Sequence, residues 1–461
     1  MTRTARLALA LGCSGVGALM PMVVGAMGFA KALALGPAMA VAGFMLLDPM
    51  RPLLLLVFFV PTDALANLLF RGLPLSASMA LTLATLAALV FEFPREARER
   101  RLGPDDPVVR WTLAFALWCL VSTLFADHRD TALEAMGRLA GMMLLVPLIV
   151  RIVQTVAQAR LMVLALVAAT MFTSTVLVAD SVLGVRLLSN EGAAVNAAWE
   201  GIARSAGASD YNPTTAAIMI ASGTVMALVL ALESPQYRLF TGAAAALGLA
   251  ASVLSYARSA ALCILLVGLL LAWRHRARRG FPLAMAGLLA MAVAMLPIVP
   301  ETYWDRLATL TNFSSDYTLW RRLGYNLIGL DLLADNPLLG AGPANFHYHY
   351  VDQEYRYIPG RTMFARHLHN MYLGVASEMG LVGLALFLAL LGSGLLRLRR
   401  LAGRPGETVD GAFAAAIYHG ALAYLLGSLF MPHQYAKFTW ILAGLAGALA
   451  RAMQADPVKR E

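Results

Sequence analysis

The chain has 461 residues, of which 59% are hydrophobic and only 14% are charged. A soluble globular protein has about 45–50% apolar and about 25% charged residues, so this composition excludes an ordinary soluble domain. Apolar runs of about 18 residues, each long enough to cross roughly 30 Å of hydrocarbon, recur along the chain. We therefore predict an all-α, polytopic membrane protein with a single transmembrane domain over residues 1–461.

The first apolar run follows Arg3 and Arg6 and has some features of a secretory signal peptide. It is longer than the usual apolar region of about 7–15 residues and lacks a convincing cleavage site, so we interpret it as the first membrane helix. We expect about 12–14 transmembrane helices in total, because the shorter candidates can be partial spans. The candidate spans are near 7–28, 32–47, 52–69, 75–92, 108–126, 139–155, 160–184, 213–232, 238–257, 259–274, 281–299, 372–397, 411–431 and 436–452.

The formal net charge of +9 is concentrated in short clusters that flank apolar runs. If the N-terminus is cytoplasmic and the spans alternate, the clusters at 95–101, 274–279 and 397–404 and the C-terminal tail all fall on the cytoplasmic side. That is the arrangement the positive-inside rule describes, and it accounts for the basic residues without nucleic acid as a partner. We therefore predict a protein with both termini in the cytoplasm.

Two arginines lie where predicted spans begin or end on the outer side. Arg204 precedes the span that begins near Pro213, and Arg258 follows the antiparallel return span 238–257. Because an antiparallel hairpin brings its two ends together, we expect Arg204 and Arg258 to be neighbours. The guanidinium fork fits phosphate oxygens, so the pair suits a diphosphate. The alternative is that each arginine is an interfacial anchor that extends its charge to water.

The longest segment without a predicted span is a periplasmic loop over residues 300–368. Within it, SDYTLWRRLGYNLIGLDLLADNPLLG (315–340) carries helix start and stop signals and apolar residues at helical spacing. We predict an amphipathic helix that lies on the outer membrane surface or over the helical bundle. Arg321 and Arg322 on this helix are candidate contacts for phosphate or for an acidic acceptor.

His369 lies at the outer end of the span 372–397 by the same alternation. With an unperturbed pKa near 6.5, histidine is a natural general base close to neutral pH. On an ideal helix, Gly380 lies about 20° and Gly383 about 40° from His369, so we expect both glycines to share its face and admit a neighbouring helix. Glu378 falls about 180° away, and we expect it to pair with another helix. Further histidines on this side are candidate polar contacts: His347, His349, His367 and His433.

Four motifs resemble those of the O-antigen ligase and polymerase superfamily. His369-Asn370, nine residues, Gly380, two residues and Gly383 match its H-[NSQ]-x9-G-x-x-G signature. NPLLGAGPANF (336–346) is similar to its N-P-x-x-G-x-G element, and two further segments are similar to its arginine elements. Those segments are RSAGASDYNP (204–213) and YARS (256–259). The resemblance covers about residues 200–385, with the motifs in the family's order and on the predicted outer side.

The resemblance implies a metal-independent glycosyltransferase that moves O-antigen from undecaprenyl diphosphate to lipid A-core at the periplasmic face of the inner membrane. His369 would be the catalytic base, Arg204 and Arg258 the diphosphate ligands, and Asn370 a neighbouring substrate contact. No cofactor and no metal ion are implied. The sequence agrees to the extent that it contains no D-x-D motif.

The same donor fits two other enzymes. An O-antigen polymerase uses a second lipid-linked glycan as acceptor, and a protein O-oligosaccharyltransferase uses Ser or Thr. The short segment after the last predicted span favours the ligase modestly. A transporter of lipid-linked glycan would place its key charges near the bilayer midplane, whereas the polar candidates here lie at one face, which favours an enzyme.

Overall fold

The computed structural model describes residues 41, 43–71, 75–91, 105–188, 204–295, 317–358 and 364–455. Within these ranges the regular structure is entirely helical, and the predicted all-α, polytopic membrane fold is confirmed. Among the described residues, 8 helices are long and apolar enough to cross a membrane, or up to 9 if one bent pair is a single span. The eight are α7 (Pro107–Leu124), α8 with α9 (Arg129–Ile152), α10 (Val156–Leu183), α12 (Pro213–Glu233), η1 with α13 (Pro235–Leu254), α14 (Arg258–His275), α19 (Met371–Leu401) and α20 (Val409–Gly427).

Every predicted span from 52–69 onward coincides with a helix or a helix pair. Of the four not yet named, three fall on α5 (Ala77–Phe91), α15 (Phe281–Met295) and α21 (Lys437–Ala455), and the fourth is 52–69. The predicted span 7–28 and most of 32–47 lie outside the described residues.

The candidate span over 52–69 is broken in the structure. The chain forms α3 (Met50–Phe59) and α4 (Asp63–Leu69), which are bent by 116° relative to each other. The break is stabilised by distant segments, because Thr173 of α10 donates a hydrogen bond to the Pro61 carbonyl at 3.2 Å. The Ala64 amide donates to the Ala208 carbonyl at 3.0 Å. Backbone groups that a continuous helix would satisfy internally are therefore satisfied from outside.

Successive membrane helices run in opposite directions, so that alternate helix ends lie together at each end of the bundle, as the predicted alternation of spans requires. Charged contacts join distant helix ends at one end of the bundle: Arg397 with Asp106, Arg274 with Glu233, and Arg160 with Asp410. Two of the basic clusters predicted to be cytoplasmic, 274–279 and 397–404, share this end. At the opposite end, the Met371 amide donates to the Ser428 carbonyl at 2.8 Å, and the Asp127 amide donates to the Ala341 carbonyl at 3.3 Å.

Helix α12 forms the centre of the bundle and is buried along most of its length among α10, α13, α14 and α20. Glycines allow these close approaches. A Cβ at Gly223 would lie 1.8 Å from the Thr170 hydroxyl oxygen of α10, and a Cβ at Gly420 would lie 2.4 Å from Met226. Small residues at such contacts are typical of packed membrane helices. The segment that carries Arg204 leads directly into this rigid helix.

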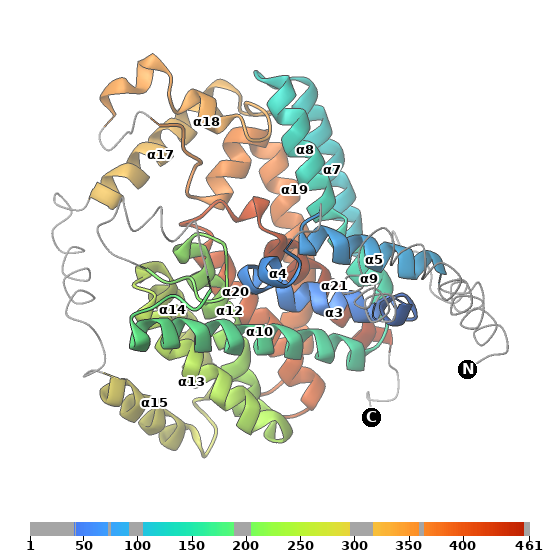
Figure 1. Cartoon of the computed structure of the whole chain (residues 1–461), viewed down its shortest axis with the longest axis vertical. Helices are drawn as coiled ribbons and strands as arrows, with labels where there is room; N and C mark the ends of the chain where they lie inside the picture. Colours follow the sequence, from blue (N-terminus) through green and yellow to red (C-terminus); the bar gives the residue numbers. More distant parts are fainter. Residues whose placement is uncertain are drawn as a thin grey trace, which may run out of the picture.

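The amphipathic helix expected within 315–340 is confirmed as α17 (Tyr317–Asp335). It lies with the short helix α18 (Phe346–His349) at the top of Figure 1, and both helices contact α19. Its buried side chains belong to a small separate core composed of Tyr325, Ile328, Leu332, Phe346, Tyr350, Tyr355 and Leu368. Three of the leucines that gave the helical pattern are instead exposed: Leu323, Leu327 and Leu330. The helix thus packs by the face that carries Tyr325, Ile328 and Leu332.

Candidate active site

Helix α19 is broken at the signature glycine, Gly380, which has φ 72° and ψ 177°. A loop from the preceding motif fits into the break. The Leu381 amide donates to the Pro337 carbonyl at 2.8 Å, and the Gly342 amide donates to the Glu378 carbonyl at 2.9 Å. The two motifs therefore hydrogen-bond to each other through their backbones.

Glycine is required on both sides of this contact. A Cβ at Gly380 would lie 1.8 Å from the Leu338 carbonyl oxygen, and a Cβ at Gly340 would lie 2.4 Å from the Glu378 carbonyl carbon. Both glycines also have positive φ, a conformation that L side chains rarely adopt. The spacing of glycines in the two motifs thus reflects one tightly packed junction.

The expectation that Gly380 shares the face of His369 is wrong, because His369 precedes the helix and Gly380 interrupts it. Its close neighbour is a loop rather than a helix. Gly383 does admit a helix, since a Cβ there would approach Trp118 of α7 to 3.2 Å. Glu378 pairs with the turn η5 (His433–Tyr435) rather than with a membrane helix, and accepts a hydrogen bond from the Tyr435 hydroxyl at 2.7 Å.

The imidazole of His369 is held in one tautomer by its own chain. Its Nδ1 lies 2.7 Å from the His367 carbonyl oxygen. A carbonyl can only accept a hydrogen bond, so Nδ1 of the neutral ring carries the proton and Nε2 keeps its lone pair. The ring also stacks on Tyr325 of α17. Neutral His369 therefore has the tautomer of a general base with Nε2 as the reacting atom.

Asn370 is the N-cap of α19. Its side-chain oxygen accepts hydrogen bonds from the Tyr372 amide at 3.1 Å and from the Leu373 amide at 3.2 Å. Asparagine is among the preferred N-cap residues, and this role accounts for a small polar residue directly after the histidine. A substrate contact by Asn370 stays a prediction.

Arg204 is buried and lies against the turn that precedes Arg258. Its Nε donates to the Ser255 carbonyl at 3.1 Å, and its Nη2 donates to the Thr214 hydroxyl at 3.3 Å. Ser255 is the C-cap of α13, and Arg258 begins α14 three positions later. Tyr256 between them has a φ of 54°, which gives the sharp turn. The hairpin thus brings the two arginine elements together as the sequence predicted.

Residues 243–388 match the family model described as O-antigen ligase. This match covers less than half of the chain and supports a relation to the O-antigen ligase superfamily. A search of curated proteins found no match. The matched range contains Arg258, the glycine junction and His369, whereas Arg204 lies before it. The match supports a broad function of the ligase and polymerase type, in a bacterial membrane enzyme that acts on lipid-linked glycans.

Positively charged side chains lie near the candidate base. Burial lowers the pKa of His369 to about 4, and the charges of Arg322 and Arg321 act in the same direction. Arg322 also lies over the Phe430 ring, 5.5 Å from its centroid. The α17 arginines are thus within electrostatic range of His369, and the imidazole is neutral at neutral pH. Their contact with substrate stays a prediction.

A second histidine, His433, lies between the segment that carries Arg204 and the segment that carries His369. It is buried, and its Nε2 lies 3.4 Å from the Thr215 hydroxyl. Thr215 is next to Thr214, the partner of Arg204. His433 also lies within electrostatic range of His369. The sequence indicated His433 only as a polar contact without a motif, because its partner Thr215 is remote in the chain.

Of the three remaining candidate histidines, His349 joins its segment to the residues that follow α7, and His347 and His367 make local contacts. The two ring nitrogens of His349 lie 3.0 Å from Asp127 at the end of α7 and 3.3 Å from Asp352. His347 Nδ1 lies 2.6 Å from the Ala344 carbonyl oxygen. His367 supplies the backbone carbonyl that orients His369. Contact of these histidines with the acceptor stays a prediction.

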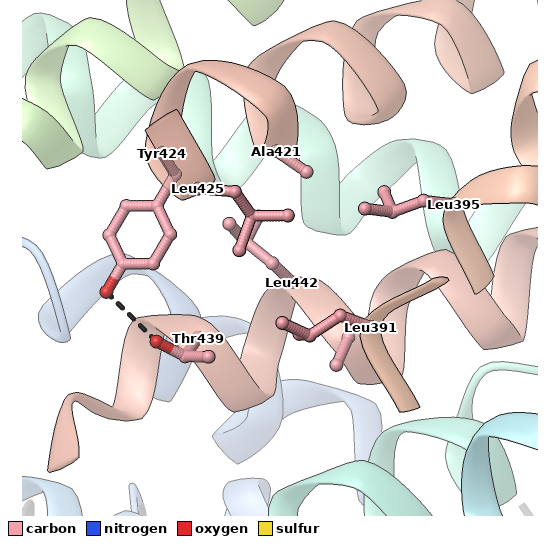
Figure 2. A pocket seen from close by; sticks show the side chains of 8 residues that line it. Leu391, Leu395, Ala421, Tyr424, Leu425, Thr439 and Leu442 are labelled. Carbon is pink, nitrogen blue, oxygen red and sulfur yellow. Dashed lines mark hydrogen bonds between the residues drawn. The ribbon is translucent and has the colours of Figure 1, made fainter. Parts of the chain in front are cut away.

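A small apolar pocket lies between α19, α20 and α21 (Figure 2). Tyr424 forms one wall, and its hydroxyl lies 3.1 Å from the Thr439 hydroxyl. The Tyr424 ring also stacks on His433. The pocket lining is Leu391, Leu395, Ala421, Tyr424, Leu425, Thr439, Leu442 and Ala443.

Proposed function

We propose that the chain is an O-antigen ligase, which transfers O-antigen polysaccharide from undecaprenyl diphosphate to lipid A-core at the periplasmic face of the inner membrane. The observation that carries this proposal is the fixed tautomer of His369. Its Nδ1 is bound to a carbonyl, so its Nε2 lone pair is available to accept a proton. No metal ion or cofactor enters the proposal.

The reaction is a single displacement. His369 Nε2 takes the proton of an acceptor hydroxyl as that oxygen attacks the anomeric carbon of the donor sugar. The bond between this carbon and the diphosphate oxygen breaks, and its electron pair leaves with undecaprenyl diphosphate. The imidazolium then releases its proton to water. The products are glycosylated lipid A-core and undecaprenyl diphosphate.

The arginines act on the leaving group. Negative charge grows on the diphosphate as the bond breaks, and guanidinium groups aimed at its oxygens stabilise that charge. We assign this role to Arg204 and Arg258. Arg321 and Arg322, which lie within electrostatic range of His369, and Asn370 would contact phosphate or the acidic acceptor.

The acceptor distinguishes the ligase from its relatives. Protein reconstituted into vesicles is supplied with lipid-linked O-antigen and, separately, with lipid A-core, a second lipid-linked glycan, or a protein with exposed Ser and Thr. A ligase forms a covalent product with lipid A-core alone. Chain extension of the lipid-linked glycan would identify a polymerase, and a glycoprotein would identify a protein O-oligosaccharyltransferase. Movement of donor across the vesicle without any covalent product would identify a transporter.

A further inference from the structure

We propose that His433 is a positioning residue that holds the His369 segment and the Arg204 segment in register. The inference rests on the proposed function, because it assigns a role to a residue behind that site. His433 is 1% exposed, so it cannot contact substrate. It acts through the first turns of two helices, α19 and α12.

The connection to α19 passes through Ser428. His433 Nδ1 lies 2.8 Å from the Ser428 hydroxyl oxygen, and that hydroxyl donates its hydrogen to the Tyr424 carbonyl at 2.8 Å. The serine oxygen must therefore accept from Nδ1, which carries a proton. The Ser428 carbonyl in turn accepts from the Met371 amide at 2.8 Å, two residues after His369.

The connection to α12 passes through Thr215. Burial lowers the pKa of His433 to about 3, so the ring is neutral. Because Nδ1 holds the proton, Nε2 has a lone pair and accepts from the Thr215 hydroxyl at 3.4 Å. The adjacent Thr214 hydroxyl accepts from Arg204 at 3.3 Å. One neutral ring thus joins the helix that follows the base to the helix that follows the arginine.

The ring itself cannot turn freely. It stacks on Tyr424 with centroids 4.6 Å apart and ring planes at 11°. The Thr439 hydroxyl donates to the His433 carbonyl at 2.6 Å and fixes the backbone. Because the ring is fixed in this way, its two hydrogen bonds fix the start of α12 relative to the start of α19.

Two single substitutions break the α12 connection from opposite sides. Thr215→Val removes the hydroxyl donor, and His433→Asn retains a donor for Ser428 but is too short to reach Thr215. We expect each to raise the KM for lipid-linked donor about five-fold, the value of one ordinary hydrogen bond, with a smaller change in kcat. The double variant is no worse than either single, because both remove the same bond. Thr215→Ser keeps the hydroxyl and matches the wild type.

The inference is overturned if the two effects multiply in the double variant, or if both single variants keep the wild-type donor KM. A second measurement does not depend on glycan transfer. His433→Phe can keep the stack on Tyr424 but loses both hydrogen bonds, and amide exchange at the first turns of α12 and α19 should become faster. Unchanged exchange overturns the inference. The proposed function can fail separately. If the wild-type protein transfers no glycan but amide exchange is faster in His433→Phe, only the proposed function is contradicted.

Discussion

The imidazole of His369 and the phenol ring of Tyr325 are stacked, with centroids 4.9 Å apart and ring planes at 16°. Tyr325 is 3% exposed and belongs to the small core beneath α17. Tyr325 of α17 therefore covers one face of the His369 ring. The hydrogen bond to the His367 carbonyl fixes the rotation of that ring. The segment that contains α17 is thus a structural part of the candidate site.

Tyr325 should act through its ring and not through its hydroxyl. Tyr325→Phe keeps the stack, so we expect wild-type kcat within about two-fold. Tyr325→Leu keeps an apolar side chain but loses the aromatic face, and kcat should fall about two- to ten-fold, the value of an aromatic pair. Steady-state transfer assays measure both. Equal rates for the two variants would contradict the role of the stack.

The pH dependence of transfer should report the charge around His369. The base works only when neutral, and its pKa is lowered to about 4, so kcat/KM should stay constant from neutral pH down to about pH 5. Arg322→Gln removes a positive charge and should raise that pKa, which moves the acid limb to higher pH. Arg356→Gln, on a ring contact with Tyr357, is the control. If kcat/KM instead falls near pH 6.5, and Arg322→Gln does not shift that pH, the pKa of His369 is not lowered by its surroundings.

The glycine junction should be essential for folding. Gly380→Ala puts a Cβ where the Leu338 carbonyl oxygen is 1.8 Å away. It also forces alanine into a backbone region used almost only by glycine, which costs about 1–3 kcal/mol. We expect a lower unfolding temperature and loss of folded protein in detergent. Gly392→Ala in the same helix meets no atom within 4 Å and should be harmless. Similar unfolding temperatures for the two variants would contradict the claim that folding requires glycine at position 380.

The two arginines should govern donor binding. Arg204→Ala and Arg258→Ala should weaken binding of undecaprenyl diphosphate to the purified protein more than His369→Ala does. Lysine at either position should restore binding only in part, because an ammonium lacks the guanidinium fork. Titration of the purified variants with undecaprenyl diphosphate measures these affinities. Wild-type affinity in both alanine variants would mean that the arginines only anchor helix ends.

Helix positions and their alternation could be predicted because they depend on local hydropathy and charge. The bend after α3 could not, since the break at Pro61 is stabilised by Thr173 and Ala208, which are distant in sequence. The orientation of α17 was also missed. Its leucines suggest one apolar face, but the face that packs is the one with Tyr325, because partner residues outside the helix decide burial.

The candidate site divides in the same way. His369, Arg204 and Arg258 could be chosen from motifs and topology. The N-cap role of Asn370 was not predicted, although asparagine directly before a helix is a preferred N-cap. The role of Gly380 was not readable, because it depends on a contact with another motif. His433 was missed as a connecting residue because its partner Thr215 lies in another helix.

The most direct test of the account compares variants in a strain that lacks this gene but makes lipid-linked O-antigen. Lipopolysaccharide gels should show the O-antigen ladder with the wild-type gene and with His367→Ala, which keeps the backbone carbonyl that orients His369. His369→Ala should insert normally, give no ladder and leave lipid-linked polymer to accumulate. A ladder with His369→Ala would contradict the assignment of the base. Single repeat units on core in the deletion strain would contradict the ligase and indicate a polymerase.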